Sequence, residues 1–116
     1  MTMVLTTVFF ESILATTVAV LFAIAGAVNL AGLGTVTRDF ARWGYPAWFR
    51  LFCGALELLS AALLSRQQTR VLGLALAGVI MTGALFTLLR NREPFRHLAP
   101  ALIFSALVVV TVAVRS

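Results

Sequence analysis

A single carboxylate, Glu57, stands in the middle of an otherwise apolar run, FRLFCGALELLS (residues 49–60). Around it, polar and small residues recur at spacings of three and four, which places them on one stripe of a helix: Arg50, Cys53, Gly54, Glu57, Ser60 and Ala61. A carboxylate can act as a general acid or base when it lies within hydrogen-bond reach of the proton that it moves. Glu57 is therefore the candidate catalytic residue.

The sequence lacks the residues that most other kinds of site require. It has one cysteine, Cys53, so neither an internal disulfide nor a C-x-x-C redox pair can form. It has one histidine, His97, whereas a haem held by two histidines or a zinc site needs more ligands. We expect His97 in a loop or at an interface, and we expect no metal and no cofactor held by ligands of this chain.

The composition indicates the solvent around these residues. Of 116 residues, 61% are hydrophobic and 11% are charged, and the mean hydropathy is +1.03. About 20 apolar residues form a membrane-spanning helix, and four such stretches are present: 12–33, 46–65, 71–90 and 98–114. Short polar connections join them, so we predict an all-α integral membrane protein, a single antiparallel up-down four-helix bundle. The first stretch has no basic residue before it and is expected to remain as a span.

Small residues indicate how the helices of this bundle pack, and the arginines indicate how the bundle is oriented across the membrane. The stretch 71–90 is expected to pack centrally through its small residues, Gly73, Ala77, Gly78, Gly83 and Ala84. All nine basic residues are arginine. Six flank one side of the bundle (Arg38, Arg42, Arg50, Arg90, Arg92 and Arg96) and three the other (Arg66, Arg70 and Arg115). The positive-inside rule makes the six-arginine side cytoplasmic and puts both termini outside.

The segment 35–45 is expected to lie at the membrane interface. Aromatic residues, including Trp43 and Tyr45, gather there and just beyond it beside Arg38 and Arg42, a mixture typical of headgroup-level anchors. The segment is predicted either as an aromatic belt or as a flap that covers a pocket. The arginines flank apolar spans, so we expect them to contact membrane lipids and not nucleic acid. Glu11 is expected to be an interfacial residue at the outer end of the first span.

Helix geometry then predicts a pocket. Counted from the six-arginine side, Glu57 lies about 16 Å deep, Thr82 about 12 Å, Ser105 about 10 Å, and Asn29 and Arg50 about 6 Å. We interpret Arg50, Asn29, Thr82, Ser105, Trp43 and Tyr45 as candidate ligand-binding residues of a pocket that ends at Glu57. Phe22, Phe86 and Phe104 would form its walls. The alternative is that Glu57 only stabilises packing through a hydrogen bond to a neighbouring helix.

The motifs Gly44-Tyr45-Pro46 and Gly54-Ala55-Leu56-Glu57, within residues 29–92, resemble those of DoxX-like proteins. These are small four-helix membrane proteins of bacteria. The resemblance implies a location in the bacterial cytoplasmic (inner) membrane. The namesake proteins are associated with a thiosulfate- and quinone-linked membrane oxidoreductase and related members with oxidative-stress complexes. It therefore implies a bound quinone or other lipid and redox or stress-response partner proteins.

Two functional classes remain open at this stage, with a third beside them. The chain could bind a lipophilic, quinone-like molecule and act with redox partners. It could instead be a small membrane enzyme that uses Glu57 as general acid or base on an apolar substrate, in an isomerisation or ring opening. A purely structural or assembly subunit is the third alternative, and a homo-oligomer stays open.

Overall fold

The computed structural model describes residues 2–115, and it is helical with no strand in that range. The long helices are α1 (Thr2–Ala31), α3 (Ala47–Leu64), α4 (Arg70–Arg90) and α5 (Phe95–Arg115). Two short helices connect them: α2 (Val36–Arg42) and the 3-10 helix η1 (Gln67–Thr69). The prediction of an all-α protein is confirmed.

Within the described residues, four stretches are long and apolar enough to cross a membrane: Thr2–Ala31, Ala47–Leu64, Gln67–Arg90 and Phe95–Arg115. They coincide with the four predicted ones, but three begin earlier, and the third of the four does so because it includes η1. α1 begins at Thr2 and not at Ser12, because its first residues are also apolar and the hydroxyl groups of Thr6 and Thr7 donate to carbonyls of their own helix. α5 begins at Phe95 and not at Leu98, since the amide of His97 already donates to the Pro94 carbonyl.

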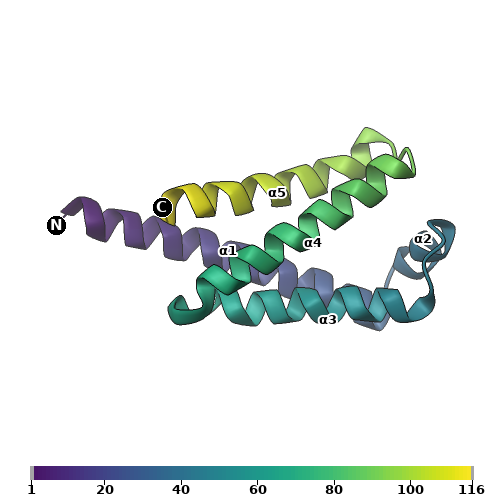
Figure 1. Ribbon diagram of the computed structural model, residues 1–116, viewed down its shortest axis with the longest axis horizontal. Coiled ribbons are helices and arrows are strands. Elements are labelled where there is room, and N and C mark those ends of the chain that lie inside the picture. Colours follow the sequence, from purple (N-terminus) through teal and green to yellow (C-terminus); the bar gives the residue numbers. More distant parts are fainter. Residues whose placement is uncertain (1, 116) are drawn as a thin grey trace.

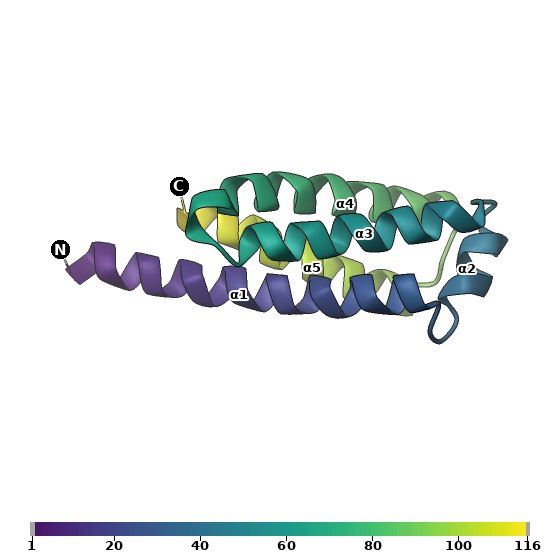
Figure 2. The same ribbon diagram turned by 90° about the horizontal axis from the view of Figure 1, so that it is seen from below.

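The long helices pack side by side around one core. α1 contacts α3 and α5, and α4 contacts the same two helices (Figure 1). The first turns of α1 project beyond the other helices, as Figure 2 shows. We call the end of the molecule that carries α2 the α2 end and the opposite one, where α3 joins α4, the η1 end. Fully buried side chains between the helices include Val18, Phe22, Leu64 and Ala77.

α1 and α3 approach each other closely through their backbones. A Cβ atom on Gly26 would lie 2.8 Å from the carbonyl oxygen of Gly54, and one on Gly54 would lie 3.0 Å from that of Gly26. Glycine at both positions lets the two backbones touch, as small residues do in membrane helix pairs.

α4 packs less centrally than the sequence predicts. A Cβ on Gly73 would lie 2.8 Å from the Leu64 backbone nitrogen, and Ala77 is fully buried, so these two residues do form contacts. Nothing lies within 4 Å of a Cβ placed on Gly78 or Gly83. The expectation that these two glycines serve close packing is therefore wrong.

A buried ion cluster ties the helices together at the η1 end. Glu11 of α1 is 4% exposed, and its Oε1 accepts hydrogen bonds from Nη1 of Arg70 at 3.1 Å and Nη1 of Arg115 at 2.9 Å. Arg70 also donates from Nε to the Leu64 carbonyl at the end of α3. Arginines of two other helices thus enclose the carboxylate of Glu11, which the sequence alone did not predict.

Candidate functional site

Glu57 lies inside the helix assembly and accepts a hydrogen bond from a residue of α1. Its side chain belongs to the buried face of α3, together with Gly54, Ser60 and Ala61. The amide Nδ2 of Asn29, two residues before the end of α1, donates a hydrogen bond to Glu57 Oε1. A buried carboxylate needs such a partner, because it has lost the hydrogen bonds of water.

Arg50 approaches the same residues but not the carboxylate. Its Nη1 donates to the main-chain carbonyl of Asn29, and at 3.3 Å to that of Leu30. Both carbonyls belong to the last turn of α1, so Arg50 acts as a cap for that helix. Asn29 therefore links Arg50 to Glu57, with its backbone bound to one and its side chain to the other.

A cavity of about 650 Å³ opens beside Glu57. Asn29, Trp43, Tyr45 and Glu57 line it, and the rings of Phe22 and Phe104 stack in its wall with centroids 5.7 Å apart. Further lining residues include Phe40, Phe49, Phe52, Cys53, Phe86, Thr87, His97 and Ala101. The cavity is thus mainly aromatic and apolar, with polar groups at Glu57 and near α2.

A second buried carboxylate, Glu93, lies at the α2 end, in the turn between α4 and α5. Its side chain is 2% exposed. Oε1 accepts from Trp43 Nε1 at 2.8 Å and from Arg42 Nη1 at 2.7 Å, and Oε2 lies 2.8 Å from His97 Nδ1. We call these four residues the latch. Beside the latch, the Tyr45 hydroxyl lies 2.7 Å from Thr87 Oγ1. Hydrogen bonds and an ion pair thus connect α2 and the residues after it to α4 and to the turn before α5.

The latch is built around an ionised carboxylate. Hydrogen bonds from Trp43, then His97, and the neighbouring Arg42 lower the pKa of Glu93 to about 2. A carboxyl with a lowered pKa stabilises the fold above its unfolded pKa, and this contribution is lost only as the pH falls through about 2. Glu93 is therefore ionised, and able to accept these hydrogen bonds, at neutral and mildly acidic pH.

A comparison with protein families now places the chain. The model of the DoxX-like family matches residues 13–111, which is most of the sequence. The chain belongs to the DoxX-like family. With four apolar helices long enough to span, it is a multi-pass membrane protein. No curated protein and no solved structure matches it.

The structure of this DoxX-like protein brings some of the predicted site residues together. Asn29, Trp43, Tyr45 and Glu57 all line the cavity, and so do the three predicted wall residues, Phe22, Phe86 and Phe104. What these residues bind stays a prediction. His97 lies in the first turn of α5 and lines the cavity with Nδ1 held by Glu93.

Arg50, Thr82 and Ser105 do not line the cavity. Arg50 caps α1 instead. Thr82 is exposed and donates to the Gly78 carbonyl of its own helix at 2.7 Å. The Ser105 hydroxyl oxygen is buried without a hydrogen-bond partner among the described residues. Depth alone selected Thr82 and Ser105, and depth along a helix does not say which way a side chain points.

Glu93 and Thr87 are the polar residues that sequence reasoning missed in this DoxX-like protein. Glu93 stands in a charged connection, NREPFRH, where a carboxylate is ordinarily exposed. Its spacing of four from His97 was the available signal, because residues i and i+4 face each other across a helical turn. Among residues 2–115, no group of three His, Cys, Asp or Glu side chains could hold a metal ion.

Proposed function

We propose that this DoxX-like protein binds a lipophilic small molecule in the cavity, with the polar group of that molecule against Asn29 and Glu57. The observation that carries the proposal is a buried carboxylate, hydrogen-bonded by a half-buried amide, on the wall of a cavity of about 650 Å³ that is otherwise mainly apolar and aromatic. Cavities of about 300–1,000 Å³ with a few convergent polar groups are typical of small-molecule sites.

A quinone-like ring suits these surroundings. Phe22 and Phe104 offer flat apolar surfaces, and a carbonyl oxygen of the ring could accept a hydrogen bond from Asn29 Nδ2. Membership of the family supports redox or stress-response proteins as partners, since the chain has no redox-active ligand set of its own in the described range. The latch would then control the entry of this molecule into the cavity, because two latch residues, Trp43 and His97, line the cavity, as does the neighbouring Tyr45.

A catalytic role for Glu57 is the second candidate. Asn29 fixes one carboxylate oxygen and leaves the other for a bound molecule, an arrangement suited to proton transfer on an apolar substrate, as in an isomerisation or ring opening. Turnover by the purified protein alone would favour this function. A phenotype that depends on a partner protein would favour the binding function.

Filling the cavity tests the proposed binding directly. Gly83 lines the cavity and has open space around its Cβ position, so Gly83→Leu adds a side chain without a clash. We expect gently purified Gly83→Leu protein to retain the lipophilic molecule at least about tenfold more weakly, a loss of about 1.4 kcal/mol. Native mass spectrometry of the purified protein measures the retained molecule.

Gly78→Leu is the matched control for that experiment. Gly78 lies on the same helix, also has open space at Cβ, and does not line the cavity. The two variants change helix propensity equally, so any difference between them reports the cavity. Equal retention by both variants, at the wild-type level, would show that the molecule binds elsewhere or not at all.

We further propose that the four long helices form an antiparallel bundle across the bacterial cytoplasmic membrane, with the α2 end in the cytoplasm and both termini outside. The six-to-three division of the nine arginines supports this orientation. Single cysteines at Gln67 and Asn91, in a Cys53→Ala background, should react with impermeant reagents from opposite sides, Asn91 from the cytoplasm. Labelling of both from one side would contradict four spans, and a cytoplasmic Gln67 would reverse the orientation.

A further inference from the structure

Among the described residues, the ion cluster at the η1 end carries one more positive than negative charge. Nη1 of Arg70 and Nη1 of Arg115 both donate to the same oxygen, Oε1 of Glu11. Arg70 is 5% exposed, and its Nε donates a hydrogen bond to the Leu64 carbonyl. Arg115 is less enclosed, since its side chain is 31% exposed and Glu11 is its one ion-pair partner among residues 2–115. Two guanidinium groups thus share one carboxylate beside an apolar surface, and Arg115 holds the accessible donors.

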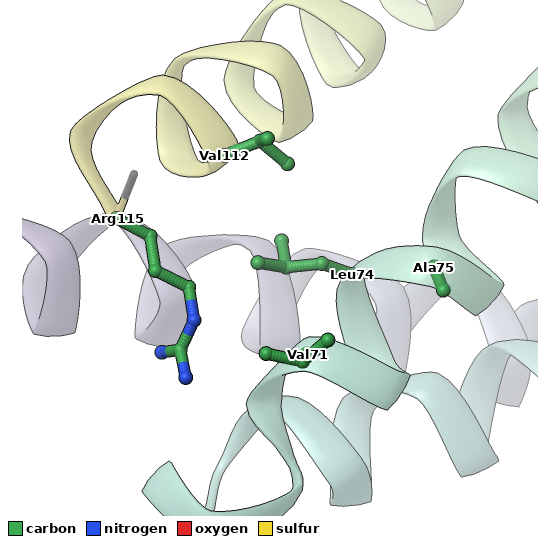
Figure 3. Close-up of a pocket in the computed structure, with 5 residues that line it drawn as sticks. All are labelled: Val71, Leu74, Ala75, Val112 and Arg115. Atoms are coloured by element: carbon green, nitrogen blue, oxygen red, sulfur yellow. The ribbon is translucent and has the colours of Figure 1, made fainter.

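A groove of about 410 Å³ runs between α4 and α5 directly beside Arg115. Val71, Leu74 and Ala75 of α4 line one side, and Val112 and Arg115 of α5 line the other (Figure 3). In Figure 3 the Arg115 side chain descends from the end of α5 toward Val71, so its guanidinium lies at one end of an apolar channel. Val71 and Val112 are about half exposed, at 56% and 46%, so the groove is open to the surroundings of the helices.

We propose that this groove binds an anionic phospholipid, with the phosphodiester on Arg115 and one acyl chain along Val71, Leu74 and Val112. Guanidinium groups bind phosphate through paired, charge-assisted hydrogen bonds. The apolar channel matches a hydrocarbon chain, and the uncompensated positive charge favours a lipid with net negative charge over a zwitterionic one. Arg70 and Arg115 are the ends of helices about 30 Å long, which places the cluster at headgroup level. The site is independent of the cavity at Glu57.

The test uses the purified full chain in micelles with equal amounts of phosphatidylglycerol and phosphatidylcholine of identical acyl chains. Native mass spectrometry should show one tightly retained phosphatidylglycerol. Arg115→Gln should weaken its retention at least about tenfold, because a charge-assisted hydrogen bond is lost. Arg66→Gln is the matched control, since it removes the same charge from an exposed side chain at the same end of the molecule and should change nothing.

A second variant keeps the charge cluster intact. Val112→Phe adds bulk at a half-exposed position of the groove and should also lower phosphatidylglycerol retention, whereas Gly83→Leu in the other cavity should leave it unchanged. The proposal is overturned if the wild-type protein retains both lipids equally. It is also overturned if Arg115→Gln behaves like Arg66→Gln, or if Val112→Phe keeps the wild-type preference.

Discussion

Gly26→Val should destabilise the folded protein far more than the same change at Gly78. The added Cβ on Gly26 would lie 2.8 Å from the main-chain oxygen of Gly54, and a main-chain atom cannot move aside as a side-chain end can. Overpacking of a tight contact costs about 1–3 kcal/mol, sometimes more. At Gly78 nothing lies within 4 Å of the new atom. The unfolding midpoints of Gly26→Val and Gly78→Val, measured by circular dichroism during detergent denaturation, should differ, with the lower midpoint in Gly26→Val.

The same variant should disturb the site as well as the fold. Asn29 stands three residues after Gly26 on α1, and Glu57 stands three residues after Gly54 on α3, so each polar residue lies one turn from the glycine contact. The close approach of the two backbones therefore brings Asn29 Nδ2 to Glu57 Oε1. If Gly26→Val and Gly78→Val unfold at the same midpoint, α1 and α3 do not touch at these glycines.

Much of the fold could be predicted because the apolar runs are long and their connections short. The stripe around Glu57 predicted the buried face of α3 correctly, since Gly54, Glu57, Ser60 and Ala61 are all buried. Periodicity identifies a face only where polar and apolar residues alternate with the helical repeat. α4 is apolar on nearly all sides, so nothing in its sequence distinguished Thr82, which is exposed, from Thr87, which is buried beside the cavity.

The polar contacts between different helices could not be predicted, because they join residues that are distant in sequence. Glu11 meets Arg70 and Arg115 across 59 and 104 positions, and Trp43 meets Glu93 across 50. The position of a residue in the sequence predicts its depth along a helix but not which helices are neighbours. Glu11 lies about a third of the way along α1, since that helix begins at Thr2.

Glu57→Gln should weaken retention of the lipophilic molecule by about tenfold to a hundredfold, because one charge-assisted hydrogen bond is worth roughly 1.5–3 kcal/mol. Glutamine keeps the shape of the side chain and an oxygen that can still accept from Asn29 Nδ2, so α1 and α3 should remain bonded. Native mass spectrometry reports the retained molecule, and the unfolding midpoint reports the fold. Thr82→Val is the matched control, because Thr82 is exposed and bonds only within α4.

Glu57→Leu separates the three functions that the cavity allows. It removes the acceptor of Asn29 and the polar end of the site together, so retention should fall at least as far as in Glu57→Gln. Replacing a buried polar group by an apolar one of similar size can be neutral for stability, so a fold that survives Glu57→Leu identifies Glu57 as a site residue. Normal retention with lost turnover in Glu57→Gln would instead assign catalysis. Unchanged retention and activity in Glu57→Gln, with a damaged fold in Glu57→Leu, would reduce Glu57 to a packing residue of a structural subunit.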